Sequence, residues 1–408
     1  MWWHKYYLSV VLATIICCHS TTASAQSFRM KEPGSVETIR FDLVRNLIVV
    51  QLKINGHGPY NFALDTGVGY MLITEPSLVD SLHIISQRTI KIQGVGEGTT
   101  YEAHITGPLN IEMPGLICND ISAALFTKDQ FGLSAYAGRT IHGLLGYEFF
   151  SQLAVKIDFE DSSLVVSAPK NMRYYRRAVK LPITIEDRKP YLTANVTFAN
   201  GTTKQSKLLI DLGAGHFISM ENLANDKILQ PNRISADLGV GINGTLSGYL
   251  SRIKAVELGK YNVKDIIAAF PNNFSVPPSV SRDGSLGIGL LKKFKVIFDY
   301  PNNAIYIKPG VAYRKHDEHD MSGMTYYGIM DNDLIHVVID KVEPGSAASK
   351  AGIKKGDELE IIDTSLVGNM SLQQIDDLFQ SRDGRSFLLI IVRDKKYVAV
   401  RLTLKRRV

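Results

Sequence analysis

Two acidic residues stand at matching places in this sequence and could act together. Asp65 opens the segment Asp-Thr-Gly-Val-Gly, and Asp211 opens the segment Asp-Leu-Gly-Ala-Gly 146 residues later. Two carboxyl groups about 3 Å apart cannot both ionise, so such a pair shares one proton. The charged member could take a proton from a bound water while the neutral member donates to a carbonyl oxygen. This is general acid–base hydrolysis of an amide without a covalent intermediate.

The glycine two residues after each aspartate suits this chemistry. Gly67 and Gly213 lack a Cβ, so the backbone can approach a carboxylate or a substrate closely. One Asp-x-Gly alone is more often a simple turn at the end of a strand. Two copies in corresponding places favour a shared site over two unrelated turns.

The elements that would position these aspartates also occur twice. Short apolar and β-branched stretches separated by Asn and Gly predict strands rather than helices. A Gly-Val-Gly follows each aspartate by 28 or 29 residues, and residues 142–159 align without a gap with residues 283–300. Four landmarks in the same order predict two copies of one all-β unit, at 36–168 and 181–309.

The chain changes character after residue 310. Residues 314–320 read RKHDEHD, which predicts a solvated, charged linker. The segment that follows has its own hydrophobic pattern and contains a Pro-Gly-Ser-Ala-Ala run, then Ala-Gly-Ile and Gly-Asp. We therefore expect a separate C-terminal domain.

Together these motifs resemble the aspartic proteases of the pepsin/retropepsin type. They are most similar to the bacterial two-lobed retropepsin-like aspartyl proteases that carry a C-terminal PDZ domain. The resemblance implies that Asp65 and Asp211 are the catalytic pair and that Thr66, Gly67 and Gly213 support it. It also implies that one hydrophobic-hydrophobic-Gly motif braces each aspartate, here at residues 144–146 and, less perfectly, at residues 285–287.

The same resemblance implies a Gly-rich β-hairpin flap over the substrate in each lobe. The segments in the corresponding places are 94–98 and 239–244. The flap residues expected to contact substrate are Gly94, Val95, Gly96, Gly239, Val240 and Gly241.

Three residues depart from the pattern of that family. Thr66 keeps the hydroxyl that reaches the backbone of the other lobe, whereas Leu212 has none, so half of this cross-lobe contact should be missing. Val68 and Ala214 cannot donate a hydrogen bond to a carboxylate, and donors lower a carboxylate's pKa. We therefore expect the pair to titrate at a higher pH than in strongly acidic proteases.

A PDZ domain implies a backbone loop that binds a C-terminal carboxylate, with the peptide added beside it as a strand. The best match to that loop is Tyr327-Gly328-Ile329, followed by Met330. A domain that merely packs on the protease is the alternative.

The sequence thus predicts a mainly β fold, with two pseudo-symmetric aspartic-protease β-barrel lobes followed by a PDZ domain. The expected divisions are a signal peptide at 1–25, lobe 1 at 26–170, lobe 2 at 171–310, a charged linker at 311–321 and a PDZ domain at 322–408.

The first 25 residues have the pattern of an export signal. Lys5 precedes a short apolar run at residues 8–18, and Ala23-Ser24-Ala25 follows. The run is short for a membrane span, so we expect no stable span after cleavage and a periplasmic or secreted protein. Cys118 is the one cysteine beyond this signal, so an internal disulfide is not expected.

Composition narrows the classes of partner. The formal net charge is +6 over 408 residues, a weak basic bias that does not argue for nucleic acid.

Residues 239–244 fit a Gly-x-Gly-x-x-Gly dinucleotide fingerprint, but no convincing helix follows. His316 and His319 are expected to be solvent-exposed rather than metal ligands. No cofactor and no metal are expected.

We therefore predict an exported aspartic endopeptidase acting on protein or peptide substrates, with a PDZ domain for C-terminal peptides. A catalytically degenerate protease scaffold that binds peptides remains the alternative, which Leu212 favours and the two retained aspartates oppose.

Overall fold

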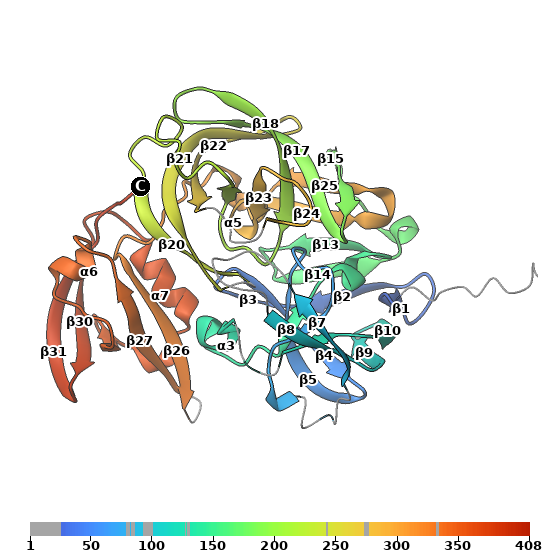
Figure 1. Ribbon diagram of the computed structural model, residues 1–408, viewed down its shortest axis with the longest axis horizontal. Coiled ribbons are helices and arrows are strands. Elements are labelled where there is room, and N and C mark those ends of the chain that lie inside the picture. The colour runs from blue at the N-terminus through green and yellow to red at the C-terminus, as the bar shows by residue number, and fades with distance from the viewer. Residues whose placement is uncertain are drawn as a thin grey trace, which may run out of the picture.

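The computed structural model describes residues 26–78, 82, 86–92, 101–126, 128, 131–241, 244–272, 277–331 and 334–408. Within these ranges the chain is mainly β, which confirms the predicted fold class. Figure 1 shows two barrel-like lobes packed together, with the C-terminal domain against one flank.

The first sheet belongs to lobe 1 and runs in the order β1-β10-β9-β4-β5-β12-β6-β11-β8-β7, with β3 beside β4. Apolar residues alternate with polar ones along the second half of β4, so one face points into the core. The strands are β1 (Arg29–Met30), β3 (Asp42–Val44), β4 (Leu47–Ile54), β5 (His57–Leu64), β6 (Leu72–Ile73), β7 (Ser86–Ile92), β8 (Tyr101–Thr106), β9 (Leu109–Met113), β10 (Leu116–Ile121), β11 (Ala124–Leu125) and β12 (Gly143–Leu145).

The second sheet belongs to lobe 2 and runs β16-β17-β18-β23-β19-β22-β21-β20. It repeats the centre of the first sheet: β23 runs parallel to β18 and antiparallel to β19, as β12 does to β5 and β6. The predicted duplication is therefore present. The strands are β16 (Thr184–Glu186), β17 (Lys189–Thr197), β18 (Thr203–Asp211), β19 (Ile218–Met220), β20 (Ile234–Gly241), β21 (Gly244–Leu258), β22 (Tyr261–Pro271) and β23 (Gly284–Gly287).

A third sheet is shared by the two lobes, in the order β15-β25-β24-β13-β14-β2. Its centre is the antiparallel pair of β13 from lobe 1 and β24 from lobe 2. One hydrophobic core spans both lobes, with Phe150 and Phe298 in ring contact at 5.4 Å. The strands are β2 (Val36–Arg40), β13 (Ala154–Asp158), β14 (Ser163–Ser167), β15 (Val179–Pro182), β24 (Phe294–Asp299) and β25 (Ala304–Pro309).

The helices of the described chain are short. α4 follows Gly146 and α5 follows Gly287, so each lobe turns into a helix after its strand beside the aspartate. The helices are α3 (Leu133–Ala137), α4 (Tyr147–Phe150), α5 (Ile288–Leu291), α6 (Ala347–Lys350) and α7 (Leu372–Phe379), with 3-10 turns η1 (Pro169–Asn171), η2 (Tyr300–Asn302), η3 (Val311–Arg314) and η4 (Val367–Asn369).

The C-terminal domain has its own sheet, β26-β27-β28-β30-β31, with β29 beside β28. It also has a separate hydrophobic core, in which α7 buries Ile375 and Phe379. A capping box at Ser371 and Gln374 begins this helix. The strands are β26 (Met324–Asp331), β27 (Leu334–Val342), β28 (Glu358–Ile362), β29 (Ser365–Leu366), β30 (Ser386–Arg393) and β31 (Lys396–Thr403).

The charged linker is solvated at residues 314–316, as predicted, but is packed against its neighbours at residues 317–320. Asp317 pairs with Lys293 at 2.8 Å, and both side chains are largely buried. Glu318 pairs with Arg252 and Arg406, one from lobe 2 and one from the end of the chain. Burial lowers the pKa of His319 to about 4. The linker is packed because opposite charges on both neighbours neutralise it.

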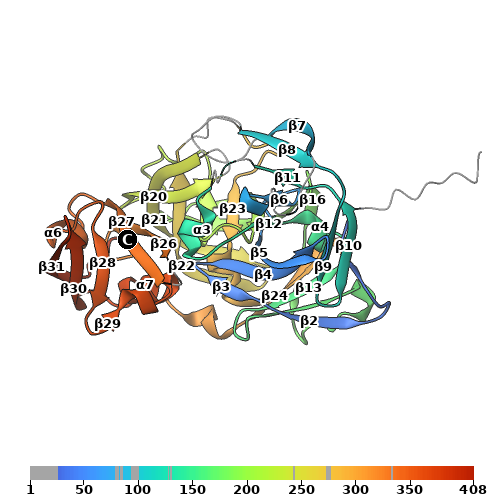
Figure 2. The same cartoon turned by 90° about the horizontal axis from the view of Figure 1, so that it is seen from below.

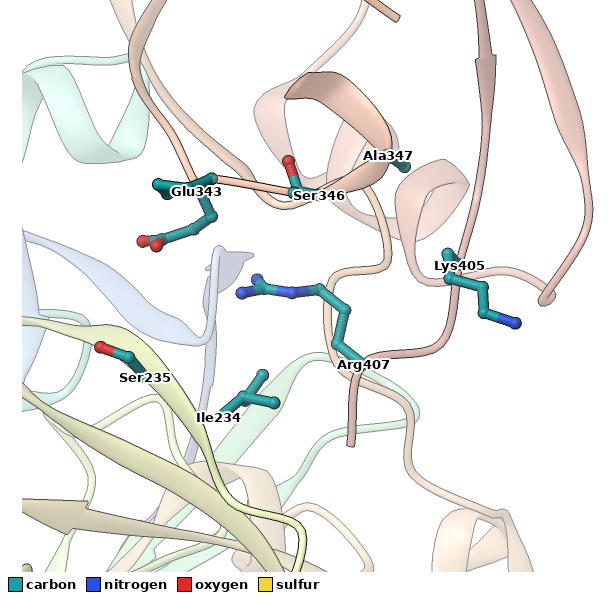
Figure 3. A pocket seen from close by; sticks show the side chains of 9 residues that line it. Ile234, Ser235, Glu343, Ser346, Ala347, Lys405 and Arg407 are labelled. Carbon is teal, nitrogen blue, oxygen red and sulfur yellow. The ribbon is translucent and has the colours of Figure 1, made fainter. Parts of the chain in front are cut away.

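A pocket of about 550 Å³ lies where the C-terminal domain meets strand β20 of lobe 2. Figure 3 shows Ile234 and Ser235 on one side, Glu343 and Ser346 on the other, and Arg407 between them. Neither Asp65 nor Asp211 lines this pocket, so it is a junction between domains and separate from the predicted site.

Candidate active site

Asp65 lies directly after β5, where this strand runs beside β12. Its backbone N–H donates to the Leu145 carbonyl at 3.0 Å, and the strand pair is parallel. The N–H of Gly67 donates to Asp65 Oδ1 at 2.7 Å. The carboxyl group is therefore fixed at the end of a buried strand.

Asp211 occupies the same place in lobe 2. It is the last residue of β18 and is paired with Gly287 of the parallel strand β23. The N–H of Gly213 donates to Asp211 Oδ1 at 2.9 Å. The local geometry of the two loops is thus the same, as the repeat predicted.

The carboxyl groups of Asp65 and Asp211 meet between the lobes, close enough to interact directly. A Cβ added to Gly67 would lie 3.0 Å from both Asp211 carboxyl oxygens, and one added to Gly213 would lie 2.3 Å from Asp65 Cγ. Each glycine leaves room for the carboxylate of the opposite lobe. The structure brings the predicted pair together.

The pair has the electrostatics of a site that shares a proton. Burial raises the pKa of Asp65 above its usual range, and the Asp211 carboxylate raises it further, against the lowering effect of the Gly67 N–H. We predicted this direction from the missing donors at Val68 and Ala214; burial and the like charge are the larger causes. A carboxyl that stays protonated beside an ionised partner is the acid–base arrangement described above.

Thr66 joins the two lobes next to the carboxyl pair. Its hydroxyl donates to the Ile210 carbonyl at 2.7 Å and accepts from the Leu212 N–H at 2.9 Å. Thr66 is 1% exposed, so water cannot replace it as the partner of these backbone groups. The bonds cross between lobes and fix the position of the Asp65 loop against the Asp211 loop.

Leu212 takes the place of this hydroxyl residue in lobe 2. Its side chain is fully buried within the core that spans both lobes. It supplies apolar packing and makes no hydrogen bond, so the side-chain bonds between the two loops come from Thr66, as predicted.

Comparisons with known proteins agree with this geometry. Residues 50–149 match the family model described as aspartyl protease, and residues 338–393 match the model described as PDZ domain. The chain carries an aspartyl protease domain followed by a PDZ domain. The match to the protease model includes Asp65 and Gly146 and ends before Asp211, so the second half of the site stands on the structure.

The chain is also similar to the solved structure of an aspartic proteinase from Irpex lacteus. The two are 11% identical, the match covers 69% of this chain and 99% of that chain, and the TM-score is 0.46. No curated protein matches the chain. The domain matches support a protease-like protein with a domain of a peptide-binding type.

The flap predicted in lobe 2 of the protease is a β-hairpin. Gly239 and Gly241 lie on β20, opposite Leu246 and Gly244 of β21, and Val240 lies between them. A strand follows the Gly-x-Gly-x-x-Gly pattern instead of a helix, so this is not a dinucleotide turn. In lobe 1, β7 pairs with β8, while the predicted flap residues Gly94, Val95 and Gly96 lie outside the described residues.

A buried polar cluster behind the lobe 2 loop was not predicted. His216 Nε2 lies 2.9 Å from Ser285 Oγ, and burial lowers the pKa of this histidine. Arg282 and Glu221 form an ion pair at 2.8 Å with side chains 6% and 4% exposed. The alignment of the two repeats pairs Leu144 with Ser285, and this polar residue in an apolar motif was the available signal.

Tyr300 is a second residue that sequence reasoning missed. Its ring is buried, and burial raises its pKa well above the usual range; the charges of Asp211 and Asp65 add to this. Within the described part of the chain its hydroxyl has no hydrogen-bond partner. Tyr300 therefore lies close enough to the pair to sense both carboxylates.

The three residues predicted to form the PDZ carboxylate loop are in a strand. Tyr327, Gly328 and Ile329 lie inside β26 and are paired with residues of β27. Residues alternate between buried and exposed along the first half of this strand, and the antiparallel pairing uses their backbone groups. The expected loop is therefore wrong at these positions, while a role in peptide binding stays a prediction.

The described residues contain neither a metal-binding cluster nor a membrane-spanning helix. No group of three or more His, Cys, Asp or Glu side chains in these ranges is placed to hold a metal ion. No helix in the same part of the chain is long and apolar enough to cross a membrane.

Proposed function

We propose that this protein is an aspartic endopeptidase that cleaves peptide bonds with a water molecule activated by Asp65 and Asp211. The observation that carries the proposal is the contact of the two carboxyl groups, one from each lobe, with the cross-lobe bonds of Thr66 beside them. Structural carboxylates do not need such a symmetric arrangement.

The chemistry follows from one shared proton. The ionised carboxylate takes a proton from water as its oxygen attacks the carbonyl carbon, and the neutral carboxyl donates a proton to the carbonyl oxygen. The resulting tetrahedral diol then collapses: the C–N bond breaks as the amine nitrogen takes a proton from the newly protonated aspartate, and a diol hydroxyl returns its proton to the other aspartate as the C=O bond forms, so the pair again holds one proton. Water attacks directly, so no covalent enzyme intermediate forms.

The site of action and the substrate class are part of the same proposal. The pattern of residues 1–25 supports export, and thus a periplasmic or secreted protein. Protein or peptide chains are the substrates, and the PDZ domain binds the C-termini of substrates or partners. The hairpin of β20 and β21 closes over the substrate from the lobe 2 side.

Leu212 favours one alternative, a protease scaffold that binds peptides without cleaving them. One half of the cross-lobe hydroxyl contact is absent, and loosened loops would separate the carboxyl groups. Retention of both aspartates in contact argues against it.

Cleavage of an unfolded protein separates the two functions. We expect pepstatin-sensitive cleavage that Asp65→Asn and Asp211→Asn each abolish, whereas the exposed control Asp161→Asn has no effect. Cleavage unchanged in both site variants would defeat the endopeptidase proposal. Binding of the unfolded chain without any cleavage would support the scaffold alternative.

A further inference from the structure

Strand β26 forms an edge of the PDZ sheet, and lobe 1 covers that edge. The order of the sheet begins with β26, so β27 is its strand neighbour on one side. On the lobe 1 side, α3 packs against β26, and Figures 1 and 2 both show α3 next to β26 and near α7. PDZ domains bind a peptide as an added strand along such an edge. Lobe 1 therefore lies where a peptide would add.

Arg45 of lobe 1 bridges β26 and α7. Its Nε and Nη2 donate to the Asp376 carboxylate at 2.9 and 3.1 Å, and its Nη1 donates to the Tyr326 carbonyl at 3.1 Å. The side chains of Arg45 and Asp376 are 12% and 15% exposed. A bidentate ion pair that is shielded from water is stronger than an ordinary surface ion pair. This contact holds the PDZ domain on lobe 1.

Gly138 of lobe 1 lies directly against the C-terminal domain. A Cβ on Gly138 would lie 2.5 Å from Ile335 Cδ1 and 3.1 Å from Leu372, and a Cβ on Gly328 would lie 3.0 Å from the Gly138 Cα. The two glycine backbones are thus in direct contact between β26 and α7. Gly328 lies in β26, the edge strand beside which a peptide would add. A peptide cannot enter while lobe 1 is docked.

The turn of lobe 1 that contains Arg45 also contacts the loop of Asp211 in lobe 2. Arg45 and Asn46 form a tight turn with φ of 46° and 65°. Asn46 Nδ2 donates to the Gly215 carbonyl at 3.4 Å, and Lys292 Nζ donates to Asn46 Oδ1 at 2.9 Å. Gly215 ends the segment that Asp211 opens. Consecutive residues therefore connect the contact with β26 and α7 to the loop of one catalytic aspartate.

We propose that lobe 1 is the internal occupant of the β26 edge on the side of α7, and that a basic peptide with a free C-terminal carboxylate competes with it. Displacement of Arg45 leaves the Asp376 carboxylate with the Tyr326 hydroxyl but without its cation, so the competing peptide carries an arginine that replaces the lost guanidinium. Its binding also frees the Arg45–Asn46 turn from the Gly215 loop and slows cleavage. Only this last step rests on the proposed function.

Peptide binding to the full-length protein tests the occupancy. The probes are two fluorescein-labelled pools of ten-residue peptides with free carboxylates, identical except that one carries a single Arg and the other a Glu. We expect Arg45→Ala to bind the Arg pool at least tenfold more tightly than the unmodified protein does. We also expect this variant to bind the Glu pool more weakly than the Arg pool. The control Arg176→Ala, an exposed arginine on the connection between lobes, should match the unmodified protein. Equal affinity of Arg45→Ala and unmodified protein overturns the proposal.

Hydrogen exchange gives a second readout that does not depend on a peptide. Asp376→Asn breaks the same contact from the PDZ side and serves if Arg45→Ala does not fold, while Arg45→Lys keeps the charge and should restore part of the effect. We expect at least tenfold faster exchange in β26 for both disruptive variants. Unchanged exchange in either folded variant contradicts the docking contact.

Cleavage rates separate this inference from the proposed function. We expect Arg45→Ala to lower kcat at least fivefold while both aspartates remain. If no form of the protein cleaves, the proposed function fails and the binding and exchange results still decide the occupancy. Faster exchange with unchanged kcat in an active protein overturns the link to the catalytic loop.

Discussion

Each lobe contributes a loop of the same shape to the site, but the residue after the aspartate differs: it is Thr66 in lobe 1 and Leu212 in lobe 2. In lobe 1, Thr66 uses one hydroxyl to bond the carbonyl of Ile210 and the N–H of Leu212. In lobe 2, Leu212 packs into the shared core instead. The comparison shows that one lobe supplies the directional bonds and the other supplies packing, so a duplicated site can diverge where one copy of a contact is sufficient.

The glycines of the two loops also differ in how closely they approach the opposite carboxyl group. The position of a Cβ is tighter at Gly213, 2.3 Å from Asp65 Cγ, than at Gly67, 3.0 Å from the Asp211 oxygens. There is therefore less room for a side chain at Gly213 than at Gly67.

The largest expected effect separates these two glycines. Gly213→Ala must push Asp65 away, and a displacement of about 1 Å can cost roughly 100-fold in rate. We expect kcat/KM to fall at least about 100-fold for Gly213→Ala and clearly less for Gly67→Ala, measured on one peptide substrate. Equal losses in the two variants would remove the asymmetry.

The second effect concerns the stability of the contact between loops. Thr66→Val leaves the Ile210 carbonyl and the Leu212 N–H buried without a partner, at about 1–3 kcal/mol each. We expect the free energy of unfolding in urea to fall by about 2–6 kcal/mol. Thr38→Val, on the exposed side of β2, should change it by less than about 0.5 kcal/mol. A loss no greater than in this control would mean that Thr66 does not hold the lobes together.

The pH dependence tests the environment that the two loops create. Because the pKa of Asp65 is raised, the singly protonated pair persists to higher pH, and activity is lost only as pH rises through that raised value. We expect the alkaline limb of kcat/KM to lie at least about one unit above the ordinary carboxyl pKa of about 4. Ala214→Ser adds a donor to the charged form and should move this limb to lower pH. A sharp maximum below about pH 4 in the unmodified protein would contradict the account.

The smallest effect comes from making lobe 2 resemble lobe 1. Leu212→Thr loses buried apolar contacts but gains a hydroxyl that can bond lobe 1, at about 0.5–1.5 kcal/mol per bond. We expect a net loss of about 1–2 kcal/mol in the free energy of unfolding, less than for Thr66→Val. A loss larger than that of Thr66→Val would show that packing, rather than hydrogen bonding, dominates the contact between loops.

Local patterns in the sequence were sufficient to predict the pair and its supports. Asp65 and Asp211 each follow an apolar strand and stand two residues before a glycine. Because both repeats keep this order, the convergence of the carboxyl groups could be inferred. The missing hydroxyl at Leu212 was visible for the same reason.

Contacts between distant segments were not visible. Arg45 lies in a turn without a chemical motif, and its partner Asp376 is 331 residues away. The burial of the charged linker likewise depends on Lys293 and Arg406, which neutralise it from two other elements. Such pairs depend on how domains dock, and no spacing rule in a single sequence encodes that.

The most direct test of the central claim compares two single variants with their combination. If Asp65 and Asp211 share one proton and act as a unit, then Asp65→Asn, Asp211→Asn and the double variant should all have the same residual kcat/KM, because removing either member removes the whole function. Losses that instead multiply in the double variant, or a single variant that keeps substantial activity, would contradict the shared-proton mechanism.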